Sequence, residues 1–343
     1  MAGWLIGTAR APTVARVGAC VALSGVLAGC GASEPAGRRV GTPKVYPYLE
    51  VESTDPQDLR RVRADARVDG LILAFVVAGE GCRPVWSRGG RDATDATVQA
   101  RVAALRSAGI PVRISFGGAG GPDLASGCDT ATALATAYRA VVDAYRPDSI
   151  DLDVEGRTLA NRAGNARRVA ALLAVQQAAA RAERPLAVSY TLPAGHDGIP
   201  PDGVRLLSDS IAAGVRISAV NVMVMNYGWG VADLGDEAVR QAGMAHQLVR
   251  RLWPELSDGD AWRRVALTAM VGRTDVPGEI FRQSDARTLA RSAADLGVGW
   301  LSYWSVERDR ACPQPPPAQP SWRCSGVSQR PYEFAGILTA GIR

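Results

Sequence analysis

Histidine and lysine are nearly absent from this sequence. Its 343 residues include two histidines, His196 and His246, and a single lysine, Lys44. A mechanism built on a serine–histidine or cysteine–histidine pair would need one of these histidines, and neither lies in a recognisable nucleophile motif. The cysteines are not spaced as zinc ligands and no histidine accompanies them, so we expect no metal site.

Long apolar runs and clusters of like charge are also scarce. Beyond the N-terminus, no stretch is apolar enough to predict a membrane span. The net charge is +5, but the arginines that carry it are scattered along the chain. There is no basic stripe and no nucleic-acid-binding motif, so we expect no nucleic-acid partner.

The N-terminus has the pattern of a targeting segment. Arg10 and Arg16 precede an apolar run over 17–28, and no acidic residue occurs before Glu34. The run ends in Leu-Ala-Gly-Cys at 27–30, which resembles the lipobox of bacterial lipoproteins. We therefore expect a signal peptide over 1–29, a lipid on Cys30 that anchors the protein to a membrane, and a flexible tether over 30–43. Simple secretion, with cleavage near Ala28, and a soluble protein with an apolar start are the alternatives.

Export changes the interpretation of the cysteines. Four remain after the leader, and an even number in an exported chain favours disulfides. The sequence allows three pairings, of which we favour Cys82 with Cys128 and Cys312 with Cys324. The second pair would close a proline-rich loop near the C-terminus, before a last short helix over 332–338.

From residue 44 onward, short β-rich runs alternate with amphipathic helical ones. Such alternation predicts parallel strands, and eight units in one domain over 44–343 favour a (β/α)8 barrel. A doubly wound open sheet is the alternative, but no G-x-G-x-x-G follows the first strand. Ser284 is the expected N-cap of the helix that ends at Leu296. The expected strands cover 45–51, 71–77, 112–116, 150–154, 186–192, 219–225, 265–270 and 299–304.

The fourth expected strand carries an unusual acidic pattern. Period two places Asp151, Asp153 and Glu155 on one face, and three branched apolar residues on the other. Like charges in a partly dry site raise one another's pKa, which allows one carboxyl to remain protonated and act as an acid. In a barrel, Glu155 would stand at the C-terminal end of the strand, where active sites are built. A solvated edge strand with a polar face is the alternative.

The acidic run over 148–155 resembles the D-G-x-D-x-D-x-E signature of glycoside hydrolase family 18, the chitinases and their relatives, with Ser149 in place of the glycine. Three further elements occur in matching order: an S-x-G-G element at 115–118, an M-x-Y element at 225–227, and a tryptophan at 304. Taken singly, the glycine pair also suits a turn and Trp304 also suits a core position. Period two predicts that Met225 and Tyr227 share one face and that Asn226 lies on the other.

The M-N-Y-G run at 225–228 looks closest to a bacterial and archaeal chitinase subgroup that has M-D-Y-G. Asn226 replaces the aspartate of that pattern. Gly228 stands where better-known family members have an aspartate after the tyrosine. Loss of either carboxylate would weaken contacts to the substrate acetamide, so the level of activity is open.

The resemblance implies a glycosidase acting on β-1,4-linked N-acetylglucosamine by a substrate-assisted, retaining mechanism without a cofactor. Glu155 would be the acid, Asp153 would hold the acetamide, Asp151 would tune Asp153, and Tyr227 would donate to the acetamide carbonyl. The alternatives are a lectin-like binding protein and an endo-N-acetylglucosaminidase on glycoprotein or cell-wall glycans. We also expect a monomer. The further residues expected at the substrate are Met225, Asn226, Trp304, Ser115, Gly117, Gly118 and Tyr190.

Overall fold

The computed structural model describes residues 42–343, except 53–60, 62–63, 65–66 and 316. These residues belong to one compact unit, Val40–Arg343. The expected signal peptide, the lipidated Cys30 and the tether up to residue 41 lie outside the described residues. Within the described part of the chain, no helix combines the length and the apolar character needed to cross a membrane.

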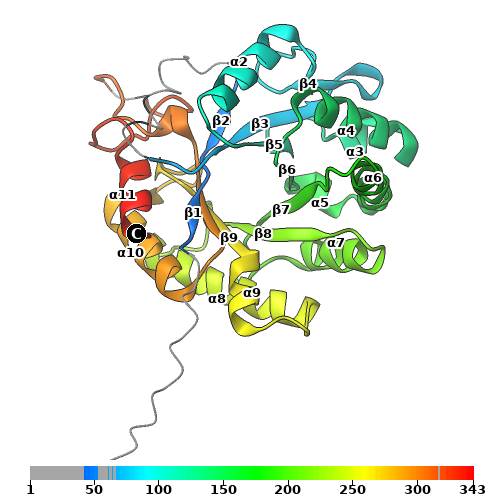
Figure 1. Ribbon diagram of the computed structural model, residues 1–343. Helices are drawn as coiled ribbons and strands as arrows, with labels where there is room; N and C mark the ends of the chain where they lie inside the picture. The colour runs from blue at the N-terminus through cyan, green and yellow to red at the C-terminus, as the bar shows by residue number, and fades with distance from the viewer. Residues whose placement is uncertain (1–41, 53–60, 62–63, 65–66, 316) are drawn as a thin grey trace, which may run out of the picture. The chain divides into compact units, whose positions relative to one another are not determined.

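The core of this unit is a closed barrel of parallel strands (Figure 1). The first strand has two short parts: β1 (Lys44–Val45) pairs with the last barrel strand, and β2 (Tyr48–Glu50) pairs with β3 (Leu71–Ala78). Because the two parts follow each other in the chain, they join the two edges of the sheet. The other barrel strands are β5 (Val112–Gly117), β6 (Ser149–Asp153), β7 (Ala187–Pro193), β8 (Ile217–Met223), β9 (Val265–Met270) and β12 (Trp300–Trp304). The (β/α)8 barrel expected from the sequence is confirmed.

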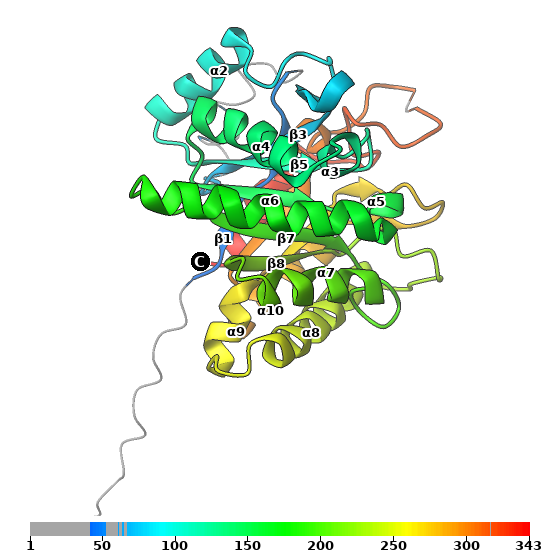
Figure 2. The same ribbon diagram turned by 90° about the vertical axis from the view of Figure 1, so that its right-hand side faces the viewer.

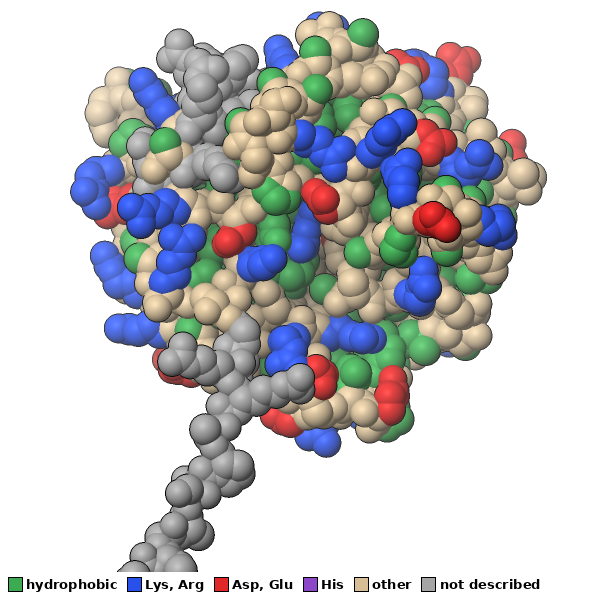
Figure 3. Space-filling model, viewed as in Figure 1, with side chains coloured by type: hydrophobic (Ala, Val, Ile, Leu, Met, Phe, Trp, Pro, Cys, Tyr) green, Lys and Arg blue, Asp and Glu red, His purple; other side chains and the backbone are tan. Residues whose placement is uncertain are grey.

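Helices surround the strands, as the two perpendicular views show (Figures 1 and 2). In Figure 2, α6 crosses in front of the strands with α4 on one side and α7 on the other. Basic and acidic side chains are interspersed over the face drawn in Figure 3. The longer helices are α2 (Ala96–Ser107), α4 (Ala131–Tyr145), α6 (Arg162–Arg181), α7 (Pro201–Ala212), α8 (Leu234–Leu252), α9 (Asp258–Arg264), α10 (Gln283–Leu296) and α11 (Glu333–Gly341). The shorter ones are α3 (Leu124–Gly127), α5 (Gly156–Ala160) and the 3-10 turns η1 (Glu80–Cys82) and η2 (Val306–Arg308).

Apolar side chains form two separate buried clusters. The larger one fills the space between strands and helices and includes Ile150, Leu152 and Val154 from the acidic strand. The smaller one lies inside the barrel and includes Tyr48 and Phe75. Successive residues of a strand point to opposite faces, so the acidic side chains of β6 point inward. The alternation read from the sequence therefore places Asp151 and Asp153 inside the barrel.

Two expected details are wrong. Helix α10 begins at Gln283 with Arg282 as its N-cap, two residues before the expected cap Ser284. The side chain of Asp285 accepts a hydrogen bond from the Arg282 N–H at 2.7 Å, which satisfies a backbone donor at this end of the helix. The first strand is interrupted near Pro47, whose ring nitrogen has no hydrogen to donate to a neighbouring strand.

Two hairpins and two disulfides extend the barrel. Strand β4 (Pro84–Trp86) runs antiparallel to β3, and β10 (Gly272–Arg273) pairs antiparallel with β11 (Ile280–Phe281) after β9. Neither hairpin was expected from the sequence. The structure joins Cys82 to Cys128 and Cys312 to Cys324, the pairing favoured above.

Candidate active site

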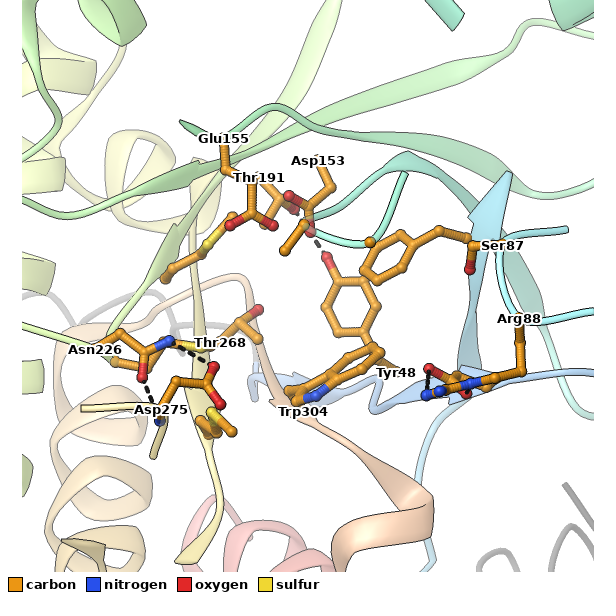
Figure 4. Close-up of a pocket in the computed structure, with 17 residues that line it drawn as sticks. Tyr48, Ser87, Arg88, Asp153, Glu155, Thr191, Asn226, Thr268, Asp275 and Trp304 are labelled. Carbon is orange, nitrogen blue, oxygen red and sulfur yellow. Dashed lines mark hydrogen bonds and ion pairs between the residues drawn. The ribbon is translucent and has the colours of Figure 1, made fainter. Parts of the chain in front are cut away.

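A pocket of about 340 Å³ opens where the barrel strands end. This size falls within the usual range for ligand sites. Figure 4 shows that carboxyl, hydroxyl and amide groups from several strands and loops face the same space. Of the residues predicted for the substrate site, Asp153, Glu155, Met225, Asn226 and Trp304 line this pocket.

Asp151 lies below the pocket, fully buried in the barrel. Its carboxylate accepts hydrogen bonds from four hydroxyl groups: Ser115 at 2.8 Å, Ser189 at 2.6 Å, Thr191 at 2.9 Å and Tyr48 at 3.0 Å. Burial raises the pKa of Asp151, and these donors oppose the rise because they stabilise the charged form. The strand that carries Ser115 therefore contributes a donor to Asp151, where the sequence suggested only a small residue.

Asp153 is the last residue of β6, and Glu155, two residues later, is the N-cap of α5. Burial raises the pKa of Asp153 well above its usual value, and the charges of Glu155 and Asp151 raise it further. Burial also raises the pKa of Glu155, while a hydrogen bond from Asp153 opposes the rise and the charge of Asp275 adds to it. Burial and like charge both disfavour two ionised carboxylates at this place, so the site favours a protonated carboxyl. That is the property a general acid needs.

Gly117 and Gly118 allow the backbone of β5 to approach β6 closely. A Cβ on Gly117 would collide with the carbonyl oxygen of Asp153, and Gly117 has a φ of 106°, where side chains are rarely tolerated. The N–H of Gly118 donates to the same carbonyl oxygen at 3.1 Å. Neither glycine lines the pocket, but together they fix the backbone that carries Asp153.

The Trp304 ring forms an apolar surface of the pocket. It stacks on Phe75 with ring centroids 5.4 Å apart and an interplanar angle of 19°, and Tyr48 packs against it at 6.1 Å. Trp304 is only partly buried, so part of its ring faces the pocket. The apolar face of a sugar ring suits such an aromatic surface.

The residues after β8 do not follow period two. The strand ends at Met223 and Asn226 has a φ of 55°, so the chain turns before the expected strand end at Met225. As a result, Met225 and Asn226 both line the pocket, and Tyr227 does not. The Tyr227 hydroxyl is buried without a hydrogen-bond partner among the described residues, and burial raises its pKa. The Tyr227 hydroxyl therefore lies outside the pocket lining, and its contact with the substrate acetamide stays a prediction.

The hairpin β10–β11 holds this turn in place. Glu279 accepts hydrogen bonds from the backbone N–H groups of Tyr227 at 3.1 Å and Gly228 at 2.7 Å. Asn226 donates to the Asp275 carboxylate at 3.2 Å, and the Asp275 N–H donates to the Asn226 carbonyl oxygen at 2.9 Å. Asp275 thus supplies a carboxylate to the pocket from a segment in which the sequence indicated no site residue.

Tyr190 does not contribute to the pocket. It is fully buried, and its hydroxyl lies 2.9 Å from the Ser210 hydroxyl of α7. Tyr190 follows the inward-facing Ser189 in β7, so period two turns its ring toward the helices. The prediction that Tyr190 binds substrate is therefore wrong.

The opposite rim carries a charged pair that the sequence did not reveal. Arg88 donates to both carboxylate oxygens of Glu50, one of these bonds being 2.6 Å. Its guanidinium also lies 4.2 Å from the centre of the Trp322 ring, in the loop that Cys312–Cys324 closes.

No set of three histidine, cysteine or acidic side chains among the described residues is arranged to hold a metal ion.

Sequence and structure comparisons both find chitinases among the proteins similar to this chain. No protein-family model matches the chain. A probable bifunctional chitinase/lysozyme of Escherichia coli is 33% identical over 289 residues, which are 79% of this chain and 32% of that protein. Endochitinase 11 of Metarhizium anisopliae is 33% identical over 287 residues, 79% of this chain and 55% of that protein. The chain thus spans only a third to about half of the length of these curated relatives.

Solved structures share the whole barrel. The catalytic domain of a hyperthermophilic chitinase from Pyrococcus furiosus matches with a TM-score of 0.77 at 27% identity, covering 88% of this chain and 96% of that one. Catalytic-site mutants of a chitinase domain from the same organism, solved with chito-oligosaccharides, match equally well. A family 18 chitinase from Pseudoalteromonas aurantia shares the fold with a TM-score of 0.52 at 18% identity, over 76% of this chain and 93% of that one. This chain is chitinase-like and has the fold of glycoside hydrolase family 18.

Within this chitinase-like barrel, sequence reasoning found the acids of one strand and missed the residues that converge on them. Asp151, Asp153 and Glu155 follow one another at period two, so their common face is readable from the sequence. Asp275 and Arg88 reach the pocket from loops. A short turn signal, Pro277-Gly278, was the only sign of the β10–β11 hairpin.

Proposed function

We propose that this protein hydrolyses β-1,4-linked N-acetylglucosamine oligomers or polymers by a substrate-assisted, retaining mechanism. The observation that carries the proposal is that the buried Asp153 and the partly buried Glu155 line one pocket together with Trp304. The relatives named as chitinases and the chitinase structures solved with chito-oligosaccharides support the same substrate class.

In the proposed reaction, Glu155 gives its proton to the glycosidic oxygen as the bond to the anomeric carbon breaks. The carbonyl oxygen of the substrate's own 2-acetamido group then forms a bond to that carbon, which gives an oxazolinium ion. Asp153 accepts a hydrogen bond from the acetamide N–H and balances the positive charge. Glu155 next takes a proton from water, whose oxygen attacks the anomeric carbon and restores the acetamide with net retention.

The arrangement of the acids supports attack by the substrate itself. A retaining enzyme with two carboxyls needs them on opposite sides of the scissile bond, about 5–5.5 Å apart, and family 18 is a recognised exception to this scheme. Here Asp153 is the last residue of β6, Glu155 follows it by two residues, and both line the same pocket. Asp153 therefore lies on the same side of the bond as the acid.

The charge of the pocket favours chitin-like substrates over cell-wall glycans. Its lining includes four carboxyl groups, and its one guanidinium, that of Arg88, is bonded to Glu50. Muramic acid units carry an additional carboxylate, which this lining would repel, whereas N-acetylglucosamine units are neutral. A lectin-like role would not require Glu155, whose protonation the site favours.

The proposal also includes where the protein acts in the cell. We propose that Cys30 is lipidated after export, that the mature protein acts as a monomer at the cell surface, and that it belongs to the subgroup with an M-D-Y-G element. The two disulfides support export, because such bonds persist in oxidising compartments. Mass spectrometry of the membrane fraction would detect the lipid on Cys30.

The activity is tested with chito-oligosaccharides and a form of the protein that begins at Gly31. We expect the wild type to cleave them and Glu155→Gln to lose about 10²- to 10⁴-fold in kcat while still binding, because the amide keeps the shape but has no proton to give. Glu183→Gln, on an exposed residue beyond the end of α6, is the matched control and should retain full activity. Full activity of Glu155→Gln would disprove the assignment.

A further inference from the structure

Asn226 and Asp275 bind each other across two segments that are far apart in the sequence. The amide of Asn226 donates to one carboxylate oxygen of Asp275 at 3.2 Å, and the Asp275 N–H donates to the amide carbonyl oxygen at 2.9 Å. Both side chains line the pocket (Figure 4). This reciprocal pair fixes the direction of the carboxylate, because the backbone and the side chain of Asp275 are both held.

The backbone around the pair is built to hold this geometry. Asn226 has a φ of 55°, a conformation that asparagine tolerates better than most residues. Glu279, four residues after Asp275, accepts hydrogen bonds from the N–H groups of Tyr227 and Gly228. Its buried carboxylate therefore fastens the hairpin to the turn that carries Asn226. The segment that carries Asn226 and the hairpin that carries Asp275 are thus joined by hydrogen bonds to main-chain N–H groups of both segments.

We propose that Asn226 and Asp275 act as one positioning unit, in which Asn226 directs the Asp275 carboxylate toward Glu155 and the bound sugar. This inference rests on the proposed function, because it assigns Glu155 as the acid. Burial raises the pKa of Glu155 and the nearby charge of Asp275 adds to the rise, so Asp275 helps Glu155 to keep its proton. It also offers an acceptor for a hydroxyl or N–H group of a sugar lying on Trp304.

The proposal is tested with the pH dependence of kcat/KM on a soluble chito-oligosaccharide. Removing the charge in Asp275→Asn lowers the pKa of Glu155, so the alkaline limb should move to lower pH by a few tenths of a pH unit, with kcat reduced several-fold. Asp275→Glu, which keeps a negative charge, should have an alkaline limb close to that of the wild type. Asp143→Asn, which removes an exposed charge on α4 outside the pocket, is the control and should leave the profile unchanged.

A double-mutant cycle tests whether the pair acts as a unit. Asn226→Ala should cause most of the effect of Asp275→Ala, and the double variant should be little worse than the worse single variant. If the two single substitutions reduce activity independently, so that their effects multiply, Asn226 and Asp275 do not act as one unit. If the alkaline limb is unchanged in Asp275→Asn, the charge of Asp275 does not act on Glu155. Thermal melting checks that each variant is folded.

A second readout keeps this inference separate from the proposed function. Carbon-13 NMR of labelled glutamate reports the titration of Glu155 without any substrate. A lower Glu155 pKa in Asp275→Asn than in the wild type supports the unit even if no chito-oligosaccharide is cleaved, in which case only the proposed function fails. An identical titration in both proteins overturns the inference even if cleavage is observed.

Discussion

Gly117 lies directly against the main-chain carbonyl oxygen of Asp153, with no space for a side chain between them. Gly117→Ala should therefore displace the strand that carries Asp153 and also strain a backbone with positive φ. We expect a loss of more than about 1 kcal/mol in the free energy of unfolding and a marked fall in kcat. Gly120→Ala is the control for stability: this glycine lies three residues after the end of β5, and its Cβ would meet nothing within 4 Å. Equal unfolding free energies for the two variants would contradict the close approach.

The hydroxyl donors around Asp151 give a second prediction. Tyr48→Phe removes one of four donors to a fully buried carboxyl. Because the charged form then loses stabilisation, we expect the unfolding free energy near neutral pH to fall by about 1.5–3 kcal/mol, with a smaller loss at acidic pH, where the carboxyl is protonated. Urea unfolding of both proteins at two pH values measures this. A loss that does not depend on pH would mean that the effect comes from packing alone.

Asp309 gives a prediction on stability against pH. Burial raises its pKa to about 6, although it accepts hydrogen bonds from the N–H groups of Phe334 and Ala335 at the start of α11. A pKa that is higher in the folded state gives stability that is complete below about pH 4 and is lost as the pH rises through about 6. We therefore expect the wild type to lose on the order of 3 kcal/mol relative to Asp309→Asn over this range. A constant difference between the two would refute the raised pKa.

The disulfides differ in the length of chain that they close. Cys82–Cys128 spans 46 residues and Cys312–Cys324 spans 12. Loop-closure entropy predicts that replacing both cysteines of the first pair by serine costs about 4 kcal/mol, and about 3 kcal/mol for the second. The second replacement should also weaken substrate binding, because that loop carries Trp322 against Arg88 at the pocket rim. Denaturant unfolding and KM together separate the two effects.

The sequence predicts those parts of the structure that depend on neighbouring residues, and it misses those that depend on contacts between distant residues. The barrel strands and the common face of Asp151, Asp153 and Glu155 depend on local alternation, which a β-strand preserves. Period two failed at Tyr227 because β8 ends at Met223, and a turn residue with positive φ then resets the direction of the side chains.

The remaining site residues depend on contacts between distant segments. Asp275 is 49 residues from Asn226, and Arg88 is 38 residues from Glu50. Nothing in the local pattern of either segment indicates its partner. Tyr190 was misplaced because its neighbour Ser189 occupies the inward position of β7. Side-chain direction along β7 would have excluded it.

The most direct test of the account is whether hydrolysis needs the acetamido group of the substrate. We would compare a fluorogenic chitobioside with the matched cellobioside, which has a hydroxyl in place of that group, and follow the anomeric configuration of the sugar product by NMR. The account predicts cleavage of the chitobioside alone, with the β-anomer formed first. Comparable cleavage of both substrates, or initial release of the α-anomer, would contradict a substrate-assisted mechanism with Glu155 as its acid.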